Sequence, residues 1–154
     1  MSITSLLAPE RIFTDADISS KKRLLEFIAE KAADEIGLPQ NEIFNKLLER
    51  ERLGSTGLGQ GFGVPHARLE NLEDTHACFA KLSTPVNYDA MDHEPVDLVF
   101  AIFIPQASTE EHLQILAALA RIFSQPSVTQ KIRDCDDAAC IIRIIEQAEQ
   151  ASPS

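Results

Sequence analysis

The sequence predicts a single α/β domain in which helices cover both faces of a small sheet. The chain has 154 residues, 44% of them apolar, as is typical of one folded globular domain. Segments with helical spacing lie on both sides of VDLVFAIFI, an almost wholly apolar run that indicates a covered central strand. The pattern leaves the strand directions open. We expect the domain to span 1–150 and a tail to follow over 151–154.

The first half of the chain predicts a strand and two helices. The short mixed segment 3–7 is expected to be a strand. Apolar residues recur at helical spacing over 20–36, and Gly37 follows where a left-handed residue would end the helix. A second helix is expected over about 41–52, and it stops at Gly54.

The second half predicts two strands and two helices. The strands are expected over 77–82 and 96–104. Ser108 and Glu111 have the spacing of a capping box, as N-cap and N3 of the next helix. That helix is expected to bury one stripe, made of Leu113, Leu116, Leu119, Ala120 and Phe123. The last helix is expected over about 136–148.

Charge and composition narrow the class of partner. The formal net charge of −10 argues against nucleic-acid binding, which needs a basic surface. Arg50, Arg52 and Arg68 flank the glycine run, so this region is expected to be locally positive and to attract an anion. The start of the chain lacks a secretory pattern, and the apolar stretch 98–104 is too short to span a bilayer. We therefore expect a cytoplasmic protein without membrane insertion.

The cysteines predict neither a zinc site nor a disulfide framework. Cys78, Cys135 and Cys140 are odd in number and show no CxxC spacing. In a reducing cytoplasm, all three are expected to be free thiols.

The stretch GSTGLGQGFGVPHAR places five of the six glycines before one histidine. It matches neither the dinucleotide-binding pattern Gly-x-Gly-x-x-Gly nor a P-loop, which ends in Gly-Lys-Ser/Thr. One interpretation is a mobile turn leading into a short strand. The other is that small residues make room for a phosphate or a partner beside His66. The glycines alone do not decide between the two.

The four histidines fall into two groups. His76 and His93 lie in polar contexts and are expected to be solvated. His66 follows Pro65, whose ring stiffens the approach, and His112 lies in the first turn of the capped helix, which favours negative charge. If these two histidines converge at one end of the sheet with Arg50 nearby, they form an anion-binding cluster.

Phosphoryl relay suits such a cluster best. A neutral imidazole is a good nucleophile toward phosphorus, and a second histidine with an arginine can hold the phosphoryl oxygens. The sequence has no nucleotide loop, no His-Glu-x-x-His metal motif and no Gly-x-Ser-x-Gly serine-hydrolase motif. The donor would then be another phosphoprotein, and we expect no metal or other cofactor.

The motifs RERLGSTGLGQGFGVPHARLENL and TPVNYDAMDHEPVDLVFAIFIPQASTEEHLQIL resemble the enzyme IIA proteins of the phosphoenolpyruvate-dependent phosphotransferase system, most closely the nitrogen-regulatory branch. The resemblance covers 2–147. It implies a small mixed sheet between helices, and His66 phosphorylated by an HPr-like (NPr) carrier that enzyme I supplies. Arg50 matches the family's active-site arginine and His112 its second histidine, whereas Ala67 stands where the family has glycine.

The motif also predicts further phosphate-binding residues, and the family branch predicts the partners. We assign a phosphate-binding role to Ser55, Thr56 and Arg68 of the same motif. The regulatory branch implies targets such as potassium-transport or sensor-kinase components. Two alternatives stay open: an enzyme IIA of a fructose- or mannitol-type system that passes phosphate to a IIB protein, and a binding regulator that is never phosphorylated.

Overall fold

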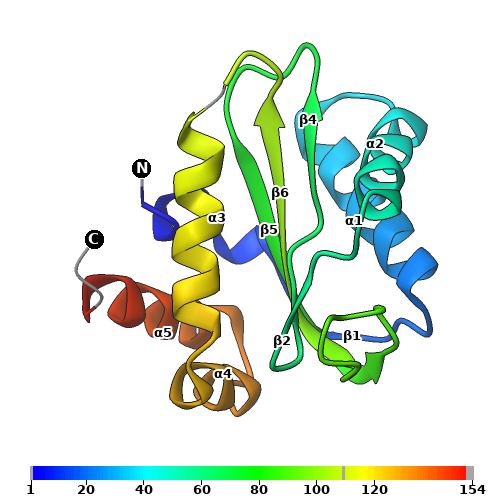
Figure 1. The fold of residues 1–154 in the computed structure, drawn as a ribbon. Coiled ribbons are helices and arrows are strands. Elements are labelled where there is room, and N and C mark those ends of the chain that lie inside the picture. Colours follow the sequence, from blue (N-terminus) through cyan, green and yellow to red (C-terminus); the bar gives the residue numbers. More distant parts are fainter. Residues whose placement is uncertain (1, 109, 152–154) are drawn as a thin grey trace.

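A computed structural model describes residues 2–108 and 110–151 and shows one mixed sheet between two layers of helices (Figure 1). The strands are β1 (Ile12–Ala16), β2 (Gly57–Gly59), β3 (Phe62–Gly63), β4 (His66–Leu69), β5 (His76–Val86) and β6 (Val96–Pro105). The helices are α1 (Lys21–Ile36), α2 (Gln40–Arg52), α3 (Glu110–Phe123), α4 (Pro126–Arg133) and α5 (Ala138–Ala151). None of these helices is long and apolar enough to cross a membrane.

The strand order is β1-β5-β6-β3-β2, and β4 also pairs with β6. The pairs β5–β6 and β2–β3 are antiparallel, whereas β1–β5, β3–β6 and β4–β6 are parallel. The expected α/β sandwich is therefore confirmed, and the mixed sheet is the one that the family resemblance implies.

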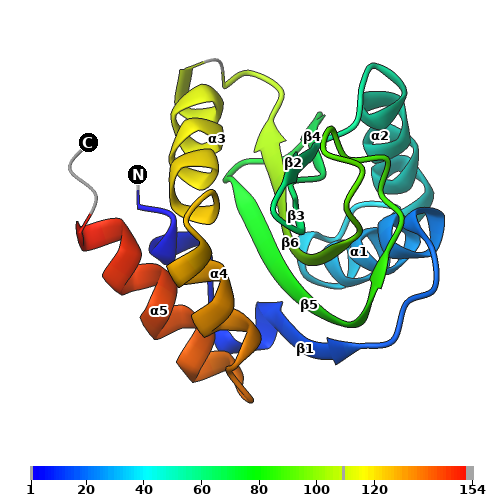
Figure 2. The same cartoon turned by 60° about the horizontal axis from the view of Figure 1, so that its bottom comes forward.

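Strand β6 is the centre of the sheet, as its apolar sequence predicts. Leu98 and Phe100 pack with α3, α4 and α5, whereas Val99 and Phe103 pack with α1 and α2. Successive side chains of a strand point to opposite faces, so one strand supplies both cores. Figure 2 shows the two helix layers on either side of this strand.

Helices α1 and α2 follow the predicted bounds to within a residue or two. The Ser20 hydroxyl caps α1 by accepting a hydrogen bond from the Arg23 N–H at 3.2 Å. Gly37 ends the helix with a φ of 83°, a left-handed conformation that glycine adopts without steric cost. Helix α2 ends at Arg52, and its C-cap Leu53 separates it from Gly54, where the glycine run begins.

The prediction of a strand over 3–7 is wrong, because Thr4–Leu6 forms a 3-10 helix. Ile3 and Leu6 are three residues apart, so a helical turn places both in the core beside α5. The first strand is β1, which the sequence analysis missed, as it missed β2, β3 and α4. Of the tail expected over 151–154, only Ala151 is described, as the last residue of α5.

The buried face of α3 differs from the predicted stripe. Its buried residues are Ile115, Leu119, Ile122 and Phe123. Leu113 is 64% exposed and Ala120 is exposed as well, so the prediction is wrong for these two residues. They are seven positions apart on one edge of the helix, and this edge faces the site described below. The predicted capping box pairs Ser108 with the Glu111 side chain, and this side chain lies outside the described residues.

Two of the three cysteines are not free thiols, which corrects the expectation. Cys135 and Cys140 form a disulfide with their Cα atoms 5.7 Å apart. The turn between α4 and α5 brings them together, a geometry that an odd cysteine count does not reveal. Cys78 is free as expected, and its burial raises the pKa of its thiol to about 12.

Candidate functional site

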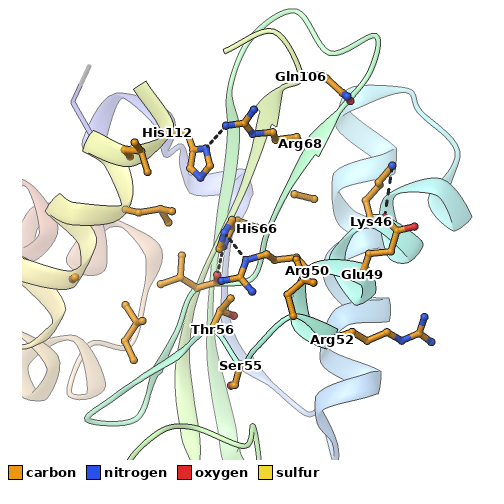
Figure 3. A pocket seen from close by; sticks show the side chains of 17 residues that line it. Lys46, Glu49, Arg50, Arg52, Ser55, Thr56, His66, Arg68, Gln106 and His112 are labelled. Atoms are coloured by element: carbon orange, nitrogen blue, oxygen red, sulfur yellow. Dashed lines mark hydrogen bonds and ion pairs between the residues drawn. The ribbon is translucent and has the colours of Figure 1, made fainter. Parts of the chain in front are cut away.

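His66 is the first residue of β4 and lies between α2 and α3 (Figure 3). It pairs with Ile102 of the central strand, whose N–H donates to the Pro65 carbonyl at 3.0 Å. Only 9% of the residue is exposed. The imidazole is therefore held beside the central strand of the sheet, and it also lines a pocket.

The hydrogen bonds of His66 define its neutral tautomer. Nδ1 lies 2.8 Å from the Val64 carbonyl oxygen, which can only accept a hydrogen bond. Nδ1 therefore carries the proton of the neutral ring, and Nε2 carries the lone pair. Nε2 accepts in turn from Nε–H of Arg50 at 3.2 Å. The nitrogen with the lone pair thus lies beside a guanidinium group.

Arg50 is fixed at the end of α2. A second nitrogen of its guanidinium group donates to the Gly54 carbonyl at 2.8 Å, one helical turn farther along the chain. This carbonyl has no partner within the helix, so Arg50 satisfies it while Nε stays on His66. The side chain lies half-buried and is oriented before any ligand arrives.

His112 and Arg68 complete the cluster from the opposite side. The ring centroids of His66 and His112 are 5.8 Å apart. Arg68, two residues after His66 on β4, donates to Nδ1 of His112 at 3.2 Å. Because Nδ1 accepts, the neutral His112 ring has its proton on Nε2. The structure thus brings together four predicted site residues: two neutral rings and two guanidinium groups.

The environment keeps both rings neutral. Burial lowers the pKa of His66 below its ordinary value of 6.5; the Val64 hydrogen bond partly opposes this, and the Arg50 charge adds to it. The pKa of His112 is also lowered, first by burial and then by Arg68, His66 and Arg50. A neutral His66 keeps the Nε2 lone pair that a nucleophile needs.

This lowered pKa makes a prediction about pH. Because the unfolded chain binds protons at His66 more readily, the stability from the neutral ring is present above pH 6.5 and is lost as the pH falls through the folded-state pKa. We expect an NMR titration of the His66 ring to give a midpoint below 6.5, and His66→Gln to flatten the acid side of the stability curve. A midpoint above 6.5 would contradict the burial argument.

Ser55 and Thr56 do not direct their hydroxyls at the cluster. Thr56 is only 4% exposed, and its hydroxyl donates to the Glu51 carboxylate. The Ser55 hydroxyl donates to the Tyr88 carbonyl at 3.0 Å. The Glu51 carboxylate is buried and needs hydrogen-bond donors, and the Thr56 hydroxyl is one of them. Both hydroxyls are therefore bonded within the protein and point away from the histidine pair.

The glycines shape the chain rather than clear space around the imidazole. A Cβ on Gly57 would lie 2.7 Å from the Cβ of Ala90. A Cβ on Gly61 would collide with the Arg133 guanidinium group, and the φ of 77° at Gly61 is left-handed. Neither glycine has His66 among its near neighbours. The glycine run is thus the β2–β3 hairpin, which packs tightly against the loop before β6, and the clearance hypothesis is wrong for these positions.

The cluster opens into a pocket of about 890 Å³ with a largely apolar wall. The apolar residues around it include Leu53, Leu58, Leu113 and Leu116. Leu53, Leu58 and Leu113 are all exposed around this one pocket, and a group of exposed apolar side chains marks a surface that another molecule can cover. The sequence analysis missed this apolar face. The signal was a leucine on each side of Gly54, outside any helical stripe.

Among the described residues, no group of three or more His, Cys, Asp or Glu side chains is placed to hold a metal ion. His93 is exposed as predicted. His76 is not solvated, which corrects the expectation: its side chain is 11% exposed and lies 3.9 Å from Glu35. Strand β5 begins at His76 and carries the ring against Phe103.

The fold and the site define an α/β protein with a neutral, arginine-flanked histidine pair at the edge of an apolar pocket. The family model described as "Phosphoenolpyruvate-dependent sugar phosphotransferase system, EIIA 2" matches residues 5–148. The chain therefore belongs to the type 2 enzyme IIA family of this phosphotransferase system.

Individual relatives agree with this assignment. The nitrogen regulatory protein of Bradyrhizobium diazoefficiens is 39% identical over 145 residues, which cover 94% of this chain and 95% of that protein. The crystal structure of IIA-Ntr from Neisseria meningitidis superposes with a TM-score of 0.90 at 36% identity, covering 93% of this chain and 98% of that one. Enzyme IIA-mannitol of Escherichia coli, solved with phosphorylated IIB-mannitol, shares the fold: its TM-score is 0.76 at 20% identity, covering 92% of this chain and 97% of that one.

Proposed function

We propose that this protein is a cytoplasmic phosphoryl carrier of the nitrogen-regulatory phosphotransferase system. It accepts a phosphoryl group on Nε2 of His66 from an HPr-like (NPr) carrier, which enzyme I charges with phosphate from phosphoenolpyruvate. Other proteins then read the phosphorylation state. The family membership and the similarity to nitrogen regulatory proteins support this function.

One observation carries the proposal: a buried neutral imidazole whose Nε2 lone pair lies beside a guanidinium group. Transfer forms the bond from Nε2 to phosphorus and breaks the N–P bond of the donor, whose nitrogen takes back the electron pair. Arg50 then moves its donors from Nε2 to the phosphoryl oxygens, and Arg68 neutralises further charge. Nε2–H of His112 donates to another oxygen of the same phosphoryl group. Ser55 and Thr56 are left out of this set because their hydroxyls already have partners.

The experiment that tests this function is a labelling reaction. The protein is incubated with labelled phosphoenolpyruvate, enzyme I and an NPr-type carrier. We expect one acid-labile phosphoryl group per chain, because a phosphohistidine is a phosphoramidate. A protein that takes no label from any phosphocarrier would instead be a binding regulator.

The apolar face around the site is proposed to receive the carrier. Its exposed leucines surround the position where the donor phosphohistidine must approach. Leu113→Glu places a charge on this face at the start of α3, where a carboxylate suits the helix. We expect the transfer rate per carrier concentration to fall about tenfold, because a desolvated apolar contact is lost. Stopped-flow labelling measures this rate.

The matched control for Leu113→Glu is Met91→Glu. Met91 is 81% exposed and lies outside the pocket lining, so this change adds the same charge elsewhere. It should leave the rate unaltered. Equal losses in the two variants would show that net charge, and not the apolar face, governs encounter.

Phosphorylation would also change how the face looks to other proteins. A phosphoryl group brings a charge of about −2 beside two guanidinium groups and thereby cancels most of the local positive charge. This gives regulatory targets, for which potassium-transport or sensor-kinase components are candidates, a clear difference to read. The sugar-transport alternative is tested by adding IIB proteins to the phosphorylated chain. Retention of the phosphoryl group supports the regulatory role, and loss to IIB supports transport.

A further inference from the structure

Glu51 is a buried carboxylate next to Arg50 in the last turn of α2, and only 8% of the residue is exposed. One of its oxygens accepts from the Thr56 N–H at 3.1 Å and from Nζ of Lys21 at 2.9 Å. The other oxygen accepts from the Thr56 hydroxyl and from the Tyr88 hydroxyl at 3.3 Å. Both oxygens of the carboxylate thus have donors, as burial of a charge requires. Two of these donors, the N–H and the hydroxyl, belong to Thr56.

Thr56 connects this carboxylate to the imidazole. Its carbonyl accepts from the Val64 N–H at 3.0 Å. The carbonyl of Val64 is in turn the group that accepts from Nδ1–H of His66 at 2.8 Å. Pro65, between them, has a fixed φ and is held from the other side by Ile102. Three connections therefore run from the Glu51 carboxylate to the His66 ring: Glu51 binds Thr56, the Thr56 carbonyl binds the Val64 N–H, and the Val64 carbonyl binds Nδ1–H.

We propose that Glu51 is a positioning residue for phosphoryl transfer: by gripping Thr56, it holds the Val64 carbonyl against Nδ1 of His66 and keeps Nε2 unprotonated and directed into the pocket. The inference rests on the proposed function. The last turn of α2 then orients the ring at both nitrogens: Arg50 donates to Nε2 directly, and Glu51 acts on Nδ1 through Thr56 and Val64.

The chemistry of the step explains why Nδ1 matters. Without a fixed acceptor at Nδ1, a neutral imidazole interconverts between two tautomers, and the form with its proton on Nε2 has no lone pair there to attack phosphorus. During transfer the ring gains positive charge while Nδ1 keeps its proton. The Val64 carbonyl and the Glu51 carboxylate both favour this charged ring, and each raises the pKa of His66 against the larger effect of burial.

Two variants break the link at different points. Glu51→Gln removes the charge and one acceptor. Thr56→Val removes one hydroxyl and leaves the Lys21–Glu51 ion pair in place. Thr56→Ser restores the hydroxyl and is the rescue variant. Glu30→Gln is the matched control, since Glu30 is exposed on α1 and far from the link in sequence and contacts.

Each variant is measured in two ways. The ¹⁵N spectrum of the His66 ring reports the tautomer, and phosphoramidate is used as the phosphoryl donor because so small a molecule needs no docking face. In that reaction the P–N bond of phosphoramidate breaks, ammonia leaves, and Nε2 bonds to phosphorus. We expect Glu51→Gln and Thr56→Val to mix the two tautomers and to slow labelling about ten- to a hundredfold, the cost of a misplaced reacting group. Thr56→Ser and Glu30→Gln should keep the Nδ1–H tautomer and the rate.

A purely structural role would give a different result. Variants that fold, keep the Nδ1–H tautomer and label at the original rate would overturn the proposal. A rate that falls only with the unfolded fraction, while the folded protein keeps its tautomer, would overturn it too. If Glu51→Gln does not fold, the tautomer and labelling rate of Thr56→Val alone test the proposal. If the unaltered protein takes no phosphoryl group, the proposed function fails, but the ring spectra still show whether the link holds the tautomer.

Discussion

Replacing His66 with alanine is expected to abolish the acid-labile phosphoryl label completely. Among the described histidines, His66 alone combines a buried ring, a proton fixed on Nδ1 and an Nε2 lone pair that faces a guanidinium group. His112 is no substitute, because Arg68 occupies its Nδ1 and leaves a proton on Nε2. The loss is measured as labelling in the reaction with phosphoenolpyruvate, enzyme I and carrier.

The control for this substitution is His93→Asn. His93 is exposed and has a φ of 62°, which asparagine tolerates. Labelling of this variant should equal that of the unaltered protein. If His66→Ala keeps its label while folded, the phosphorylated residue lies elsewhere and the site assignment is wrong.

Replacing Arg50 with lysine is expected to slow transfer by about 10²-fold, the typical cost of losing a preorganised donor to developing charge. Lysine keeps the positive charge but lacks the planar set of donors that holds Nε2 of His66 and the Gly54 carbonyl together. It also leaves that carbonyl at the end of α2 without its partner. Single-turnover labelling from a saturating carrier separates this chemical step from docking.

Arg143→Lys is the matched control for Arg50→Lys, since Arg143 is exposed on α5, away from the pocket lining. It should label at the original rate. If Arg50→Lys also did so, charge alone would suffice, and the donor geometry of the guanidinium group would play no part in transfer.

The elements that the sequence predicted correctly are those with long, regular patterns. Helices α1 and α2 and strands β5 and β6 owe their structure to local spacing, caps and an apolar run. The short strands β2 and β3 span only a few residues and form because the glycine run can pack against Ala90 and Arg133. Such packing depends on residues distant in the sequence, so no local pattern reveals it. The Cys135–Cys140 bridge is local, with its ends five residues apart, but it depends on the turn between α4 and α5, and the sequence analysis missed α4.

The same division holds for the site. The motif indicated His66, Arg50, His112 and Arg68, and the fold brings all four together. Their hydrogen-bond directions, which define the tautomers, depend on the Val64 carbonyl and on strand register, and these are tertiary properties. Thr56 and the glycines show the limit most clearly. Their residue types suggested contact with a phosphate, but their actual partners are Glu51, Ala90 and Arg133.

The most direct measurement is an NMR spectrum of the phosphorylated, ¹⁵N-labelled protein that locates the phosphorus atom. We predict phosphorus bonded to Nε2 of His66, while Nδ1 keeps its proton and its hydrogen bond to Val64. Phosphorus on Nδ1, or on any residue other than His66, would contradict the phosphoryl-carrier mechanism proposed for this site.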